Sequence, residues 1–162
     1  MWYNSKRLMT LTTHATLGAV IGAATGNPLL GFGLGLLSHF LIDIIPHGDR
    51  ELYENHKRKQ KHRRAYAFVT LDGITAVIVI ALMTGFQPIQ NLNASIALGV
   101  IGSILPDLLI GLHEAFRIKW LGWFHRFHFF FHNMISNRWG DVPLRYALLG
   151  QALFIIVLQN WF

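Results

Sequence analysis

The sequence predicts an all-α membrane protein, a polytopic helical bundle of about five transmembrane helices. Of its 162 residues, 52% are hydrophobic and only 14% are charged, whereas soluble domains typically have about a quarter of charged residues. In addition, several apolar stretches are long enough to cross about 30 Å of hydrocarbon. The length suits one compact unit, so residues 1–162 are expected to form a single integral membrane domain.

Five apolar segments are the predicted spans, and turn signals or charged loops separate them. The motif "TGNPL" marks a turn after the first span, and "GFQPIQNLN" marks one after the third. The first segment follows two basic residues, as in a signal peptide, but no clear A-x-A cleavage site comes after it. We therefore expect it to be retained. The predicted spans cover residues 8–26, 28–45, 65–85, 93–113 and 142–162.

The basic residues indicate how the spans are oriented. The densest cationic run, "HKRKQKHRR", lies between the second and third spans, and further basic residues precede the first span or follow the fourth. An even number of crossings separates these three clusters, so they share one side, and the two turns carry no Lys or Arg. The positive-inside rule predicts a multi-pass membrane protein with a cytoplasmic N-terminus and an outside C-terminus. The cationic run is interpreted as this topology signal, and no nucleic acid is expected as a partner.

A repeat of two hairpins is also predicted. The segment "GLGLLSHFLID" aligns with "ALGVIGSILPD", which pairs Asp43 with Asp107, and an upstream alignment places His14 opposite Asp72. Both hairpins would run in, out and in again, so residues 8–49 and 65–114 would form a parallel repeat about the membrane normal. The competing interpretation is a chance likeness between apolar helices.

Ionisable residues inside the apolar spans are the first functional signal, because such residues are costly in a membrane and usually serve a function. Counting helical turns from the span ends places five of them at one depth near the cytoplasmic face: His14, His39, Asp43, Asp72 and Asp107. His39 and Asp43 are four residues apart and therefore share a helical face. Imidazoles and carboxylates, in a chain without cysteine, suit Zn²⁺ and also Mn²⁺ or Fe²⁺. The set predicts a divalent metal site, most simply a zinc site.

Two further points concern this predicted metal site. Pro46 should end the second span and can turn His47 back towards the metal, which makes His47 another candidate ligand, whereas Asp49 is expected in the loop. The competing interpretation is a bundle without metal, in which Asp43 and Asp107 pair with basic side chains from the loops.

A second histidine cluster lies in residues 114–140, between the fourth and last spans. His125, His128 and His132 follow the spacing i, i+3, i+7 and share a helical face, with phenylalanines around them. One interpretation is an amphipathic helix at the membrane interface. The other is that one or two of these histidines complete a binuclear metal site. The roles of His113, His128 and His132 stay open at this point.

The motifs that carry these residues resemble a known family. They are "THATLGAVIG", "LGLLSHFLIDIIPHGD", "LPD" and "HRFHFFFH", and together they are similar to the small prokaryotic inner-membrane proteins grouped as YdjM-like metal-dependent hydrolases. That family is in turn compared with zinc-dependent phospholipase C. The resemblance implies metal-ligand roles for His14, Asp107 and His125. The chain departs from the family pattern because "LPDLLIG" lacks the following Asp-His, and the later element lacks the Gly and the Thr-His-Ser.

The expected function is hydrolysis of a phosphoester in a lipid or isoprenoid phosphate at the cytoplasmic face. Membrane lipids and a lipid phosphate are the expected partners. Asp72 is the expected metal ligand or general base, and Arg126 and Lys119 are expected to donate charge-assisted hydrogen bonds to the phosphate oxygens. The alternative is a metal-ion or proton transporter, or a metal-binding membrane protein without hydrolytic activity. Haem ligation by His14 and His39 fits poorly with three nearby carboxylates.

Overall fold

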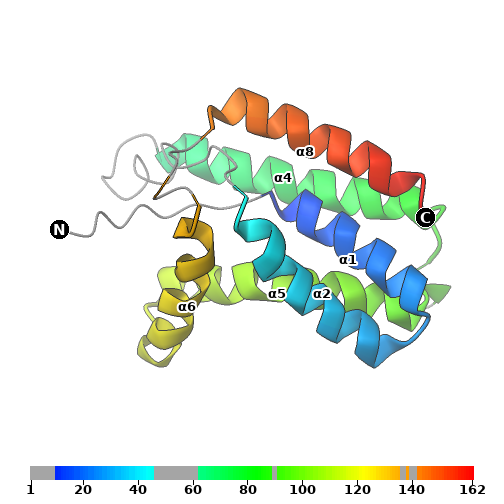
Figure 1. Ribbon diagram of the computed structural model, residues 1–162, viewed down its shortest axis with the longest axis horizontal. Helices are drawn as coiled ribbons and strands as arrows, with labels where there is room; N and C mark the ends of the chain where they lie inside the picture. The colour runs from blue at the N-terminus through cyan, green and yellow to red at the C-terminus, as the bar shows by residue number, and fades with distance from the viewer. Residues whose placement is uncertain (1–9, 46–61, 89–90, 136–137, 139–141) are drawn as a thin grey trace.

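The described part of the protein is entirely helical. The computed structural model describes residues 10–45, 62–88, 91–135, 138 and 142–162, and no strand occurs among them. Each predicted span corresponds to one helix whose ends lie within three residues of the expected ones, so the all-α prediction is confirmed (Figure 1). The elements are α1 (Leu11–Thr25), α2 (Pro28–Asp43), α4 (His62–Met83), α5 (Ala94–Phe116), the 3-10 helix η2 (Lys119–Leu121), α6 (Gly122–Asn133) and α8 (Leu144–Gln159).

The turn between α1 and α2 has the predicted local chemistry. Gly26 ends α1 in the left-handed region, with φ of 59°, a conformation that glycine adopts without steric cost. Asn27 then caps α2, because its side chain accepts hydrogen bonds from the backbone N–H groups of Leu29 and Leu30. Pro28 occupies the first helical position, where its missing N–H costs nothing.

One described helix, α5, is long and apolar enough by length and composition to cross a membrane. The apolar stretches of the other candidates are shorter: 16 residues in α2, 16 in α8, and Ala67–Met83 within α4. At about 1.5 Å per residue, the 15 residues of α1 extend roughly 22 Å, less than the hydrocarbon thickness. Helix length and composition therefore support one candidate span among the described residues, and the prediction of five spans is not confirmed.

Helices α1, α2 and α5 pack with their backbones in contact. A Cβ atom added at Gly18 or Gly35 would overlap the carbonyl of Gly99, and one added at Gly102 would overlap the backbone of Phe32. Small residues at a helix interface permit this close approach. The glycine-rich segments of the sequence thus allow α1, α2 and α5 to pack closely, so that the ends of these helices lie near one another.

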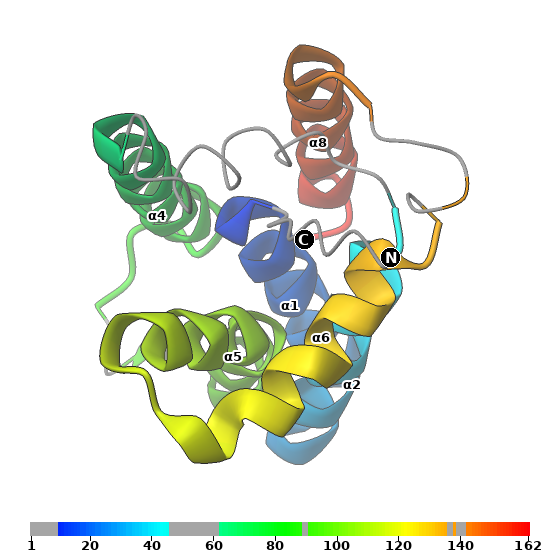
Figure 2. The ribbon, with the colours of Figure 1, turned by 90° about the vertical axis from the view of Figure 1, so that its left-hand side faces the viewer.

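Helix α1 lies in the middle of the bundle. It contacts α2, α4, α5 and α8, while α6 packs across α2 and α5 at one end of the molecule (Figures 1 and 2). The contact with α8 includes polar groups, since the Thr10 and Thr13 hydroxyls both donate to Gln151 Oε1. The contact with α6 closes the end of the bundle at which the first turn of α1 and the last turn of α2 lie.

The predicted repeat has a partial counterpart in the packing. Residues paired by the alignment meet between α2 and α5, since Gly35 packs against Gly99 and His39 bonds to Ser103. Helix α4, however, packs mainly against α1. The α4–α5 pair therefore lacks the packing that a repeat of the α1–α2 pair would have. The repeat stays a prediction.

Candidate metal centre

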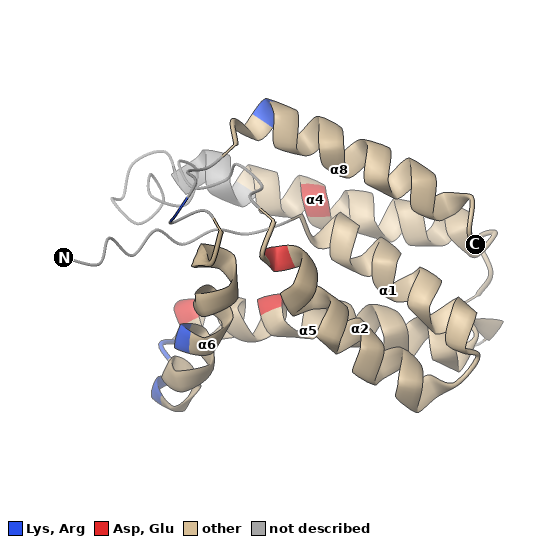
Figure 3. Ribbon diagram, in the orientation of Figure 1, with Lys and Arg blue, Asp and Glu red and all other residues tan. Residues whose placement is uncertain are grey.

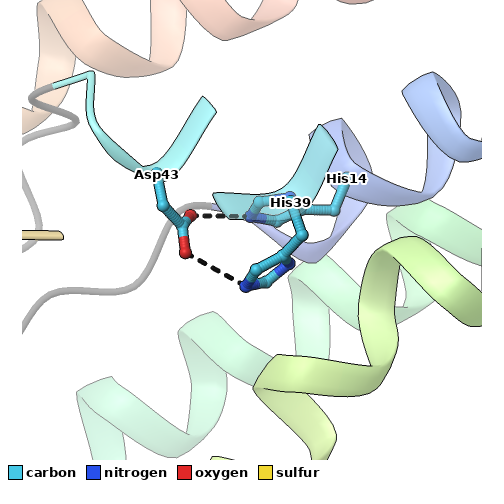
Figure 4. Close-up of side chains that lie close together, drawn as sticks. All are labelled: His14, His39 and Asp43. Carbon is cyan, nitrogen blue, oxygen red and sulfur yellow. Dashed lines mark ion pairs between the residues drawn. The ribbon is translucent and has the colours of Figure 1, made fainter. Parts of the chain in front are cut away.

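The centre begins with two residues on the last turns of α2. His39 and Asp43 are four residues apart, and His39 Nε2 lies 3.0 Å from Asp43 Oδ2. Both side chains are fully buried. Figure 4 shows the Asp43 carboxylate facing the imidazoles of His14 and His39, with one oxygen turned towards each. The spacing that predicts a shared helical face therefore does bring this pair together.

Helix α1 contributes His14 from its first turn. His14 Nε2 lies 3.1 Å from Asp43 Oδ1 (Figure 4), and the His14 ring stacks on the His39 ring with 4.0 Å between centroids. His14 is also fully buried. Two helices that are adjacent in sequence thus supply two imidazoles to one carboxylate.

Helix α5 contributes Asp107 and fixes the tautomer of His39. Asp107 Oδ1 lies 3.8 Å from His39 Nε2, and its Oδ2 lies 3.9 Å from His14 Nε2. His39 Nδ1 lies 2.7 Å from the Ser103 carbonyl oxygen, which can only accept, so Nδ1–H must be the donor. In neutral His39 the lone pair is therefore on Nε2, the atom that faces the cluster. A hydrogen bond of this kind orients metal-ligating histidines.

Helix α6 completes the cluster with His128 and His132. His128 Nε2 lies 3.3 Å from Asp43 Oδ2 and 3.4 Å from Asp107 Oδ1, and His132 Nε2 lies 2.8 Å from Asp43 Oδ2. His39 Nε2 and His128 Nε2 are only 2.9 Å apart. Both α6 histidines are buried. Four helices therefore bring six side chains into one cluster.

The donor set fits a divalent metal ion. Three overlapping groups in the described chain have ligand atoms within 4.8 Å of one another: His14 with His39 and Asp43, His39 with Asp107 and His128, and Asp43 with His128 and His132. Both Asp43 oxygens and Asp107 Oδ1 are buried without a hydrogen-bond partner of good geometry among the described residues. Buried polar atoms are normally satisfied, and a cation would satisfy these. Imidazole and carboxylate donors match Zn²⁺, Mn²⁺ or Fe²⁺.

The competing interpretation pairs Asp43 and Asp107 with basic side chains from the loops, and the side chains of the densest cationic run, residues 56–64, lie outside the described part of the chain. Within the part of the chain that the structure describes, the cationic partners of Asp43 and Asp107 are all histidines. No described Lys or Arg side chain reaches them. The described side chains of the cluster are imidazoles and carboxylates, a donor set that suits a metal ion.

The carboxylates also control the protonation of His128. Burial by itself lowers the pKa of His128, but its contacts with Asp107 and Asp43 outweigh burial and raise that pKa to about 9. Without metal, His128 therefore carries a proton at neutral pH. A metal ion that binds His128 must displace this proton.

Asp72 lies apart from the cluster and caps α1. Its carboxylate accepts hydrogen bonds from the backbone N–H groups of Leu11 and Thr12, at 2.6 and 3.2 Å, and from the Thr12 hydroxyl at 2.6 Å. These N–H groups belong to the first turn of α1, where a negative charge is favourable. Asp72 was expected at the metal, but in the structure it fixes the start of the helix that carries His14.

The remaining sequence candidates are placed as follows. His125 lies on α6 outside the cluster, with Nε2 3.5 Å from Glu114 Oε1 and its ring 5.0 Å from that of His113. Arg126 is exposed on the same helix, two positions before His128, and so points to a different side. His47 lies outside the described residues.

His128 and His132 are the ligand candidates that sequence reasoning left unassigned. They are four residues apart, the same spacing that identified His39 and Asp43, and they share the helical face noted for the second histidine cluster. The surrounding phenylalanines favoured an interfacial helix. The structure shows that this helix buries one histidine-rich side against α2 and α5.

No protein-family model matches the sequence, and neither the curated proteins nor the solved structures contain a match. The interpretation of the centre therefore rests on its own geometry and chemistry.

Proposed function

We propose that this chain is an integral, multi-pass membrane protein with a catalytic metal centre at the cytoplasmic face. The burial pattern supports the proposal that the chain lies in a membrane. The largest fully buried side chains of the described residues are mostly polar, led by His14, His39, His128 and His132. The large apolar side chains are mostly exposed, for example Leu71 at 64%, Val77 at 70% and Leu153 at 64%. Water-soluble monomers rarely expose so much apolar surface, whereas lipid tails would cover it.

The charge distribution supports the proposed orientation. Figure 3 shows that the charged residues of the described chain gather towards the end at which α6 lies, and that the end with the α1–α2 turn has none. Exposed aromatic side chains, Trp120, Trp123, Phe127 and Phe130, lie on η2 and α6 at the charged end, as expected at a membrane interface. The charged end would face the cytoplasm.

Cysteine labelling tests this orientation in a chain that has no cysteine of its own. With a membrane-impermeant maleimide on intact cells, Asn27→Cys should be labelled and Lys119→Cys should be protected until the cells are lysed. Labelling of Lys119→Cys but not Asn27→Cys in intact cells would reverse the proposed orientation. Equal labelling of both would argue against membrane insertion.

The proposed reaction is hydrolysis of a phosphoester in a lipid or isoprenoid phosphate. The single observation that supports it most is the buried set of four imidazoles and two carboxylates beneath the interfacial helix α6. A divalent ion held by these residues would act as a Lewis acid and would make water nucleophilic near neutral pH. The water oxygen would attack phosphorus, the ester P–O bond would break, and the alcohol would leave with a proton from the water.

Residues of the chain would position this substrate. The Asp107 side chain is 11% exposed, while the Asp43, His14, His39 and His128 side chains are fully buried. Asp107 therefore marks the side from which a phosphate would reach the centre. Arg126 and Lys119 are exposed at the same end of the molecule and suit a headgroup phosphate as charge-assisted donors. The likeness of the sequence motifs to YdjM-like hydrolases agrees with this proposal.

Purified protein in detergent tests the reaction. With zinc present, phosphatidic acid or a long-chain isoprenyl phosphate should lose phosphate, a chelator should stop the release, and His132→Ala should abolish it. His125→Ala is the matched control, because that imidazole lies on the same helix outside the cluster. Release that survives chelation or His132→Ala would disprove metal-dependent hydrolysis at this centre.

The complete burial of most donors favours one second candidate, a metal-ion transporter or metal-binding protein without hydrolytic activity. A fully enclosed ion is poorly placed to meet a large substrate. Tight metal binding without turnover of any lipid phosphate, together with zinc uptake into proteoliposomes, would support this alternative.

A further inference from the structure

The six donors exceed what one zinc ion uses. Structural zinc sites bind four protein ligands, and catalytic ones usually bind three and leave a position open. Here four imidazoles and two carboxylates converge, and they form three overlapping groups. The group of His14, His39 and Asp43 and the group of Asp43, His128 and His132 share only Asp43. Two sets of ligands therefore meet at one carboxylate.

The two oxygens of Asp43 contact different histidines. Oδ1 lies 3.1 Å from His14 Nε2. Oδ2 lies 3.0 Å from His39 Nε2, 3.3 Å from His128 Nε2 and 2.8 Å from His132 Nε2. A carboxylate that bridges two ions directs its two oxygens to different sets of ligands. Asp43 has Oδ1 towards His14 of α1 and Oδ2 towards the histidines of α2 and α6.

Asp107 divides its contacts in the same way. Its Oδ2 lies 3.9 Å from His14 Nε2, whereas its Oδ1 lies 3.8 Å from His39 Nε2 and 3.4 Å from His128 Nε2. Both carboxylates thus present one oxygen to the His14 side and one to the His128 side. This arrangement, seen independently in two residues from two helices, is that of bridging carboxylates between two ions.

We propose that the cluster holds two divalent ions, bridged by Asp43 and Asp107, with His14 on one ion and His128 with His132 on the other. His39 lies between the two sides, because it belongs both to the group with His14 and to the group with His128. Paired ions in phosphatases and nucleases act together on the attacking and leaving oxygens of a phosphoryl group. The inference thus deepens the proposed function and rests on it.

The charges of the cluster indicate the class of ligand that a two-ion centre would take. Two carboxylates and four neutral imidazoles bring two negative charges to two divalent cations, which together carry four positive charges. An uncompensated charge in a buried site is costly. A dianionic phosphate group lowers this excess, so phosphate monoesters are favoured over neutral or zwitterionic headgroups.

Metal stoichiometry tests the inference separately from hydrolysis. Protein stripped with chelator, reloaded with zinc and passed over a desalting column should contain two zinc ions per chain by mass spectrometry. His14→Ala should retain one ion, and His132→Ala, which removes a ligand from the other side, should also retain one. The control His125→Ala should retain two. Loading with Mn²⁺ should give a spin-coupled electron paramagnetic resonance signal in the parent protein and an uncoupled one in His14→Ala.

The outcomes separate the two proposals. One ion per parent chain, with an uncoupled manganese signal, would overturn the two-ion inference and leave the metal centre itself intact. No bound ion would overturn both proposals. Two ions in both His14→Ala and His132→Ala would overturn the ligand assignment, because neither side would then depend on its histidine.

Discussion

Replacing Asp43 by asparagine should remove most of the metal affinity, since Asp43 contacts histidines from three of the four helices of the centre, α1, α2 and α6. Its two oxygens lie within 3.3 Å of four imidazole nitrogens. The substitution keeps the size of the side chain but removes one of the two negative charges that face the ion. It also puts an amide N–H₂ group, which cannot ligate, in the place of one oxygen.

The magnitude follows from ligand linkage. At a zinc concentration 100 times the dissociation constant, binding stabilises the parent protein by about 2.7 kcal/mol, which raises Tm by roughly 5–11 °C for a chain of this size. Loss of a partner that only orients a ligand costs about 10–100-fold in affinity, so loss of Asp43 should cost at least 100-fold. The same zinc concentration would then stabilise the variant by about 0.4 kcal/mol, a shift of roughly 1–2 °C.

Thermal unfolding in detergent, with and without zinc, measures this difference. The matched control is Asp72→Asn, the same substitution at a carboxylate that caps α1. It should lower Tm in both conditions but keep the full zinc-dependent rise. A full zinc-dependent rise in Asp43→Asn would refute the assignment of Asp43 as a ligand.

Three further predictions concern packing, capping and pH. Gly35→Ala should destabilise the protein by about 1–3 kcal/mol, because the added methyl overlaps the α5 backbone. Gly33→Ala adds a methyl that meets no atom within 4 Å and should stabilise the protein by about 0.5–1 kcal/mol. Changes of the same sign for both variants in thermal unfolding would contradict the packing account. Asp72→Asn should cost about 0.5–2 kcal/mol as a lost helix cap with an unchanged zinc content, and a loss of zinc by elemental analysis would return Asp72 to the ligand set. Because the pKa of His128 is raised from 6.5 to about 9, its contribution to the metal-free protein is fully present below about pH 6.5 and is lost as pH rises through 9. The zinc-dependent rise in Tm should therefore grow between pH 6.5 and 9, and a rise that shrinks across this range would contradict the proton–metal competition.

Much of the fold was predictable because its signals are local. The turn at Gly26 and Asn27 and the apolar stretches of the five predicted spans depend on neighbouring residues, and the helix ends were located to within three residues. Helix α6 was also expected from its histidine and phenylalanine pattern. Whether each helix crosses a membrane depends on its thickness and surroundings, and α5 is the one described helix that meets that test by length and composition.

The site was predictable in part, because the depth of a residue in a predicted span could be counted from the sequence, whereas the direction of its side chain could not. His14, His39, Asp43 and Asp107 were expected at one depth, and the structure brings them together. Asp72 has a comparable depth, but its carboxylate points to the first turn of α1. The direction depends on how α4 packs against α1, which the sequence pattern does not specify.

The α6 histidines show the opposite case. Their spacing identified a shared face, but the sequence left two interpretations open, an interfacial amphipathic helix or histidines that complete a binuclear metal site. Packing against α2 and α5 places His128 and His132 beside Asp43. The residues that this face meets are therefore set by long-range packing, which the spacing does not specify.

X-ray absorption at the zinc edge of the loaded protein tests the central claim most directly, since it reports the atoms around the metal. A centre made by these histidines and aspartates predicts a shell of nitrogen and oxygen atoms at about 2.0–2.1 Å, with the outer-shell scattering of several imidazoles, which should decrease in His132→Ala. A shell of oxygen atoms without imidazole scattering, or a spectrum that His132→Ala leaves unchanged, would contradict the assignment of the metal to this cluster.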